Sequence, residues 1–122
     1  MSEIANTPEP PYYAVIFTSL RGALDADYER TASRMEALAK QQPGYLGIES
    51  VAESRLGITV SYWQNLAAIA AWKQQVEHRE AQRIGRERWY QGYAIRVARV
   101  ERNYSFTCES EASATPGESI LF

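Results

Sequence analysis

The chain has 122 residues, of which 45% are hydrophobic and 23% are charged, with a formal net charge of -2. This length and balance fit one globular domain with a modest core, and they exclude a chain that is disordered throughout. The small negative charge gives no global reason to expect a nucleic acid or an anionic membrane surface as partner, so small molecules and proteins remain.

Two features bear on where the protein works. The single cysteine, Cys108, cannot form an intramolecular disulfide, which fits a reducing compartment. The first residues lack the basic start and apolar run of a signal peptide, and no stretch of about eighteen uncharged apolar residues occurs. We therefore expect a cytoplasmic protein without a membrane partner.

The first regular elements are predicted to be a strand and a helix. Residues 12–20, YYAVIFTSL, are rich in β-branched and aromatic residues, and their apolar positions occupy both alternating faces. This pattern predicts a strand that is buried on both sides. Either Asp25 or Asp27 can cap the helix that follows, in which side chains recur at three and four residue steps from Tyr28 to Leu38.

The middle of the chain predicts a hairpin and then a helix. Residues 45–51 and 56–63 have the composition of strands, and a short polar turn at residues 53–55 joins them. The period then changes, because residues from Asn65 to Trp72 are mostly alanine, leucine and isoleucine, which favour a helix.

A second helical piece is predicted over residues 77–90. Four of its residues share one face at four, three and four residue steps: His78, Gln82, Gly85 and Trp89. A glycine inside a helix costs about 1 kcal/mol relative to alanine. Gly85 therefore indicates the close approach of another part of the chain or of a bound molecule, and close packing is the commoner reason.

Residues 93–106 predict the last strand of the fold. The domain then spans residues 12–106, between a flexible proline-containing leader at 1–11 and a flexible tail at 107–122 that is rich in Ser, Glu, Ala and Gly. The order strand, helix, strand, strand, helix, strand matches the ferredoxin-like split βαβ arrangement. We therefore expect an α+β fold with one four-stranded antiparallel sheet and its helices on one face.

The other face of this sheet needs a cover. The first and last strands are apolar on both sides, and no further helix is predicted. Packing against the same face of a second copy would bury the exposed apolar surface. The sequence therefore predicts a C2 homodimer formed through the sheet faces.

The chain resembles a known family in the order of its elements and in four local features. These are the PGYLG turn at residues 43–47, the SYW end of a strand at 61–63, the helix at 66–72 and the His78-Arg79 pair. They are similar to features of the antibiotic biosynthesis monooxygenase family, and the likeness covers roughly residues 13–106. The resemblance implies a dimeric α+β barrel. It also implies kinship with oxygenases that act on polycyclic phenols without metal or flavin, and with haem-degrading enzymes.

The haem-degrading branch has a residue pattern that this chain only partly matches. That branch has an asparagine on the first strand, a tryptophan on the second helix and a histidine ten residues later. Trp72 fills the tryptophan position, but Gln82 stands where the histidine belongs and Ser19 where the asparagine belongs. His78, one turn before Gln82, is the alternative iron ligand. Haem degradation is therefore a weaker hypothesis than cofactor-independent oxygenation.

Cofactor-independent oxygenation needs a dry aromatic pocket and a polar group that can take a proton. The residues predicted to line the substrate pocket are Trp63, Trp72, Gln82 and Trp89. The candidates for proton handling are His78, Tyr62 and Arg86. Among them His78 ranks first, because an unperturbed histidine has a pKa of about 6.5.

Each of these residues also has a structural interpretation. Trp63 and Trp72 at the two ends of a short helix are core residues more often than substrate walls. Tyr62 can be buried with its hydroxyl at the rim of the core, and Arg86 can belong to a solvated basic helix face. A non-catalytic small-molecule-binding or stress-response module with the same pocket is therefore the competing hypothesis.

The sequence contains no motif for a metal or nucleotide cofactor. No cysteine or histidine cluster has zinc spacing, and neither a GxxxxGK[ST] loop nor a GxGxxG motif occurs. The arginines of the last predicted strand recur every three residues and so alternate faces, which argues against a basic stripe for nucleic acid. We expect a small aromatic ligand, no metal and no other cofactor.

Overall fold

A computed structural model describes residues 3–108, apart from the side chains of residues 76–78. Its strands are β1 (Tyr12–Arg21), β2 (Tyr45–Glu53), β3 (Leu56–Trp63) and β4 (Tyr90–Val100). Its helices are α1 (Ala26–Lys40), α2 (Leu66–Lys73), α3 (Val76–Ile84) and the π-helical turn η1 (Gly85–Trp89). Most of the tail predicted at residues 107–122 lies outside the described residues.

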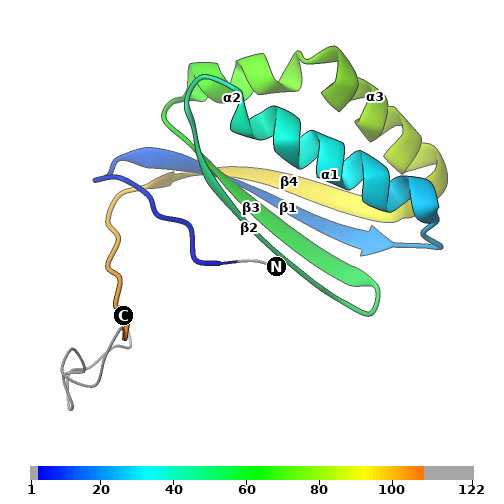
Figure 1. The fold of residues 1–122 in the computed structure, drawn as a ribbon, viewed down its shortest axis with the longest axis horizontal. Coiled ribbons are helices and arrows are strands. Elements are labelled where there is room, and N and C mark those ends of the chain that lie inside the picture. The colour runs from blue at the N-terminus through cyan, green and yellow to red at the C-terminus, as the bar shows by residue number, and fades with distance from the viewer. Residues whose placement is uncertain (1–2, 109–122) are drawn as a thin grey trace.

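The strands form one antiparallel sheet in the order β2-β3-β1-β4. Figure 1 shows α1, α2 and α3 together on one face of this sheet. The predicted ferredoxin-like α+β fold with a four-stranded antiparallel sheet is therefore confirmed. No helix in the described part of the chain is both long enough and apolar enough to cross a membrane.

The helix starts and turns follow from local chemistry. Asp25 caps α1, because its carboxylate accepts a hydrogen bond of 3.1 Å from the backbone N of Tyr28. Asn65 caps α2 in the same way, with 2.8 Å to the backbone N of Ala68. Between them, Gly44 adopts a φ of 88° where a Cβ would lie only 2.6 Å from the Ala68 Cβ. Only glycine fits this turn without strain.

The helical stretch predicted over residues 77–90 is shorter and less regular than expected. α3 ends at Ile84, η1 follows, and β4 already begins at Tyr90. The reason is tertiary, because the Tyr90 ring folds back over Gly85, where a Cβ would lie 2.7 Å from the ring. Of the two readings of Gly85, close packing is the one observed.

The last strand also ends earlier than predicted, at Val100 instead of Phe106. β1 begins at Tyr12, which pairs with Val100, so residues beyond Val100 have no β1 backbone to pair with. Two hydrogen bonds involve the proline-containing leader, whose predicted flexibility stays a prediction. The backbone N of Ala5 donates to Glu49 at 2.9 Å, and the Thr7 and Tyr12 hydroxyls are 2.8 Å apart.

The best-packed core lies between the helices and the start of β2. It centres on Trp63, Ala39 and Ile69, with Tyr45 and Trp72 packed against them. Trp63 has no exposed surface. This cluster anchors α1 and α2 to the sheet, and the space beside it forms the cavity described next.

Candidate functional site

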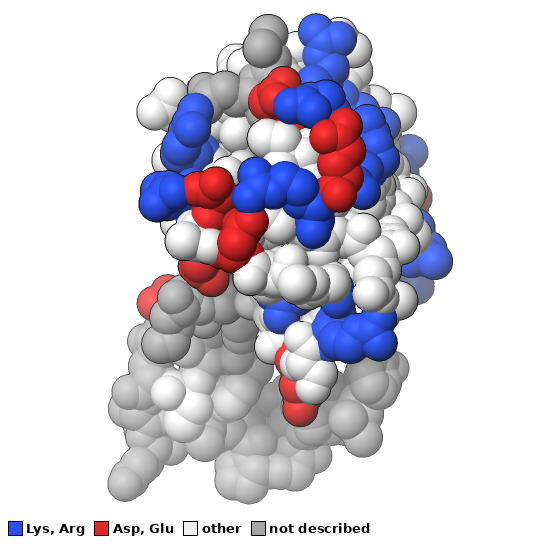
Figure 2. Space-filling view, turned by 90° about the vertical axis from the view of Figure 1, so that its right-hand side faces the viewer, with Lys and Arg blue, Asp and Glu red and all other residues white. Residues whose placement is uncertain are grey.

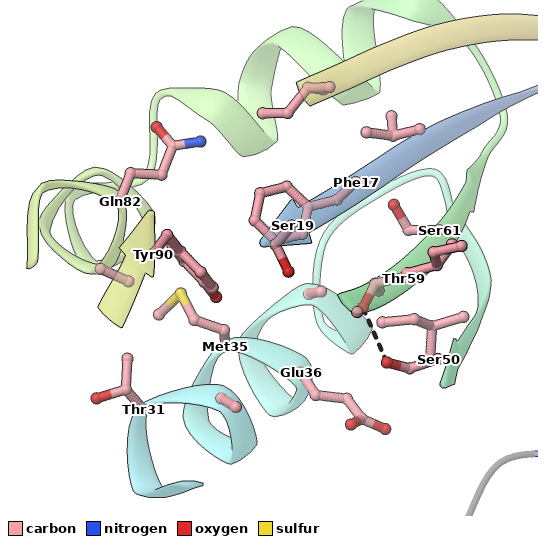
Figure 3. A pocket seen from close by; sticks show the side chains of 18 of the residues that line it. Phe17, Ser19, Thr31, Met35, Glu36, Ser50, Thr59, Ser61, Gln82 and Tyr90 are labelled. Carbon is pink, nitrogen blue, oxygen red and sulfur yellow. Dashed lines mark hydrogen bonds between the residues drawn. The ribbon is translucent and has the colours of Figure 1, made fainter. Parts of the chain in front are cut away.

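A cavity of about 300 Å³ lies between the helices and the sheet. Side chains from β1, α1, α3 and β4 surround it, with Phe17, Met35, Gln82 and Tyr90 directed toward the same space (Figure 3). Its size is at the lower end of pockets that take a small organic ligand. The structure therefore contains a partly open cavity between its helices and its sheet.

Two of the predicted pocket residues form one aromatic wall. The rings of Trp63 and Trp72 are stacked, with their centroids 5.9 Å apart and their planes 27° from parallel. The Trp63 indole N–H donates to the Ser61 hydroxyl at 2.9 Å. Trp63 belongs to the core and also lines the cavity, and its role as a substrate wall stays a prediction.

Trp89 lies at the other side of the cavity and is almost fully buried, with 3% of its surface exposed. Its indole N–H donates to the Asp25 carboxylate at 3.0 Å, and its ring meets the edge of Tyr28 at a centroid distance of 5.3 Å. Desolvation acts to raise the pKa of Asp25, but hydrogen bonds from Arg88 and Trp89 outweigh it and lower that pKa below its ordinary value. Asp25 thus stays ionised while it holds Trp89 in place.

The fourth predicted pocket residue, Gln82, extends from α3 toward the cavity (Figure 3). Near it, Tyr90 packs edge to face on Phe17 at 5.5 Å. Burial raises the pKa of Tyr90, and its hydrogen bond with Tyr28 raises it further. Tyr90 is therefore a hydroxyl donor at neutral pH and a poor proton acceptor.

The floor of the cavity carries hydroxyl groups that the sequence interpretation missed. They come from three adjacent strands: Ser19, Ser50, Thr59 and Ser61. Ser50 and Thr59 face each other across the β2-β3 ladder, with 2.8 Å between their oxygens (Figure 3). The signal was present, because residues 59, 61 and 63 alternate along β3 and must share a face with Trp63.

Tyr62 lies on the opposite face of the sheet. Its hydroxyl donates to the Glu49 carboxylate at 2.7 Å, and its ring contacts Tyr12 at 5.9 Å. Desolvation raises its pKa, and the hydrogen bond to Glu49 adds to this effect. Its neighbour Trp63 lines the cavity, so strand alternation turns Tyr62 away from it. The structure does not bring Tyr62 together with the pocket residues.

Arg86 lies on the exposed surface of η1 and does not line the cavity. It donates to the Tyr93 hydroxyl at 3.1 Å. Figure 2 shows this end of the molecule, where basic and acidic side chains alternate. Arg83 pairs with Glu80 and Glu87 on this surface. Of the two interpretations of Arg86, a place on a solvated basic helix face fits these contacts better than a role inside the pocket.

His78 lies within α3, one helical turn before Gln82. Its side chain is outside the described part of the structure, so its role in proton transfer stays a prediction. Among the side chains that are described, no group of three or more His, Cys, Asp or Glu residues could hold a metal ion.

Comparison with known proteins gives a consistent family relationship. A sequence model described as antibiotic biosynthesis monooxygenase matches residues 11–84. The uncharacterized protein YqjZ of Bacillus subtilis is 51% identical over 107 residues, which cover 87% of this chain and 94% of that protein.

Solved structures share the fold at low sequence identity. SnoaB, a cofactor-independent oxygenase from Streptomyces nogalater, superposes with a TM-score of 0.61 at 12% identity, covering 79% of this chain and 97% of that chain. A dimeric ferredoxin-like protein of unknown function from Thermobifida fusca superposes with a TM-score of 0.62 at 12% identity, covering 80% of this chain and 100% of that chain. With the family match over residues 11–84, these likenesses show that the chain belongs to the antibiotic biosynthesis monooxygenase family.

Proposed function

We propose that this protein is a cofactor-independent monooxygenase that acts on a small phenolic or quinol substrate in the cavity between its helices and its sheet. The observation that carries the proposal is the partly open cavity of about 300 Å³, which is lined by three tryptophans and by hydroxyl groups of the sheet. The family match and the shared fold with a cofactor-independent oxygenase support it.

The reaction needs no external reductant, because the substrate supplies the electrons. In the simplest case a phenol and O₂ give a quinone and water. One ring C–H becomes C=O with one oxygen atom from O₂, and the other oxygen atom leaves as water with the two hydrogens. The phenol loses four electrons and O₂ gains four. The protein has to exclude water, hold the ring and accept the phenolic proton.

The cavity residues fit these tasks unequally. Trp63, Trp72 and Trp89 line the cavity. Because Trp63 and Trp89 are almost fully buried, Trp72 offers the accessible flat apolar surface for the ring. Gln82 and the floor hydroxyls offer hydrogen bonds to its oxygens. Proton acceptance is assigned to His78, because the raised pKa of Tyr90 makes that residue unsuitable.

The homodimer is part of the same proposal. The helices cover only one face of the sheet (Figure 1), and the other face carries the cross-strand pair Ile16 and Val60 in its central strands. The Thermobifida fusca protein with the same fold is described as dimeric. We infer that two copies of this chain pack through their helix-free sheet faces.

The decisive experiment is turnover of a panel of hydroquinones and anthrone-like phenols by purified, metal-free protein under ¹⁸O₂. We expect oxygen consumption above the buffer rate for at least one compound and one ¹⁸O atom in its product. Binding without any acceleration would instead favour the competing module, which binds small molecules without catalysis. The raised pKa of Tyr90 is the observation that favours that alternative, since it removes one cavity group from proton transfer.

A further inference from the structure

One cation at the end of the cavity has no carboxylate partner among the described residues. Arg21, the last residue of β1, is half-buried and lines the cavity. One terminal nitrogen of its guanidinium donates to the backbone oxygen of Ser54 at 3.1 Å. Its Nε is buried and has no hydrogen-bond acceptor among the described residues. A buried donor without an acceptor costs about 1–3 kcal/mol, so this N–H favours an acceptor brought from outside the chain.

The surroundings of Arg21 form a small polar niche, which we define as Ser19, Arg21 and Gly57. Ser19 is 4% exposed and lies two residues before Arg21 on the same face of β1. Gly57 pairs with Ser19 across the ladder. A Cβ at position 57 would lie 3.1 Å from the Ser19 hydroxyl oxygen and 3.8 Å from the Arg21 Cδ. Any side chain larger than that of glycine at this position would therefore press on both polar groups.

The charges along the cavity make this niche the favourable place for an anion. Glu36 is the one carboxylate among the described lining residues, and Lys40 lies 3.5 Å from it. Burial raises the pKa of Tyr45, and the charge of Glu36 raises it further. Tyr45 pairs with Trp63, at the opposite end of β3 from Gly57. No acidic side chain of the described residues neutralises Arg21.

We propose that the niche of Ser19, Arg21 and Gly57 binds a carboxylate on the aromatic ligand, so that the substrates are hydroxyarene carboxylates. A carboxylate supplies acceptors for the Arg21 guanidinium and for the Ser19 hydroxyl, and charge-assisted hydrogen bonds of this kind are the strong ones. The ring then extends from the niche toward the tryptophan walls. This inference rests on the proposed function, because it assumes that the cavity holds an aromatic ligand.

The test compares two ligands that differ only in the carboxylate, 2-naphthol and 6-hydroxy-2-naphthoate, by isothermal titration calorimetry at pH 7. We expect the full-length protein to bind the carboxylate at least about tenfold more tightly, as one charge-assisted hydrogen bond provides. The methyl ester of the naphthoate should bind no more tightly than 2-naphthol. Arg21→Gln should remove the preference and leave 2-naphthol affinity within about twofold, whereas Arg21→Lys should keep part of it.

Lys73 provides the matched control, because it is the other cation among the described lining residues. Lys73→Gln should keep the preference for the carboxylate. The assignment would be overturned if Lys73→Gln abolished the preference for the carboxylate and Arg21→Gln retained it. Equal binding of both ligands to the unmodified protein would also overturn it. An equal loss of affinity for both ligands in Arg21→Gln would also overturn it, since Arg21 would then serve the phenol oxygen. The ester comparison needs no variant and decides the question even where Arg21→Gln does not fold.

Failure of this inference and failure of the proposed function give different results. Both ligands binding equally well would refute the carboxylate niche and leave the aromatic cavity intact. No binding of either ligand would refute both proposals. Tight, Arg21-dependent binding without turnover of any phenol would support the niche and refute the monooxygenase.

Discussion

The indole N–H of Trp89 donates a hydrogen bond to the Asp25 carboxylate across 64 positions of sequence, with 3.0 Å between nitrogen and oxygen. The same carboxylate caps α1 through the backbone N of Tyr28. One acidic residue therefore joins the first helix to η1 and sets the position of a cavity wall. Without it, Trp89 would keep its ring in an apolar site and lose the partner of its polar edge.

Replacing Asp25 with alanine should destabilise the protein, because the variant loses both the helix cap and the partner of Trp89. We expect a clearly lower urea midpoint than for the unmodified protein. Asp27→Ala is the matched control, since Asp27 lies in the first turn of α1 and pairs with Arg30 on the surface, where ion pairs contribute little. Equal midpoints for the two variants would contradict the assigned role of Asp25.

The lowered pKa of Asp25 predicts a specific pH dependence of stability. A carboxyl whose folded pKa lies below its unfolded value contributes stability that is present above the unfolded value, about 4, and is lost as the pH falls through the lower folded value. Asp25→Asn keeps a capping oxygen without the charge. Its urea midpoint should therefore fall less than that of the unmodified protein as the pH is lowered from 5 through the unfolded value of about 4. Parallel curves would show that the Asp25 charge contributes nothing.

Gly85→Ala tests the contact that ends α3. Helix propensity alone would favour alanine by about 1 kcal/mol. The new Cβ would however lie 2.7 Å from the Tyr90 ring, which is packed against Phe17 and Tyr28 and has little room to move. We expect a net destabilisation of about 1–2 kcal/mol in urea unfolding. Gly92→Ala is the control, because nothing lies within 4 Å of the new Cβ there, and it should change stability less. A larger loss of stability in Gly92→Ala than in Gly85→Ala would show that the Tyr90 ring moves to make room for the new Cβ.

The element order was predictable because the signals for it are local. The β-branched and aromatic run at residues 12–20, the capping candidates Asp25 and Asp27, and the polar turn before β3 are each readable within a few residues. The π-helical turn was not, because its cause is the Tyr90 ring lying over Gly85. The early end of β4 had a similar cause, since its partner strand begins only at Tyr12.

The candidate site was predictable in its aromatic part and less so in its polar part. Trp63, Trp72 and Trp89 all line the cavity, as does Gln82. Tyr62 was assigned to the same site as its neighbour Trp63, although adjacent strand residues point to opposite faces. The Nε of Arg21 has no acceptor among the described residues. This depends on how separate segments meet, and no pattern in the sequence indicates it.

Replacing Tyr62 and His78 in separate variants should show which of these two predicted proton carriers the reaction needs. Tyr62→Phe removes a hydroxyl on the far side of the sheet from the cavity, so turnover should stay within about twofold of the unmodified protein. His78→Ala should lower kcat at least about 100-fold, the usual contribution of a general base. The measurement is oxygen uptake with the best substrate of the phenol panel. Loss of turnover in Tyr62→Phe with activity retained in His78→Ala would reverse the assignment.

A charged side chain placed on the helix-free sheet face should prevent the proposed homodimer from forming. Ile16 lies in the central strand β1 and pairs with Val60 on one side and Arg96 on the other. Ile16→Lys would bury an ammonium group beside Arg96 in the proposed dimer interface, and an unpaired buried charge is strongly unfavourable. We expect the unmodified chain to sediment as a dimer at micromolar concentration and the variant as a monomer. Leu66→Lys, at an exposed position of α2, should remain dimeric. A stable monomer for the unmodified chain would contradict the dimer, because the apolar face of β1 and β3 would then stand in water.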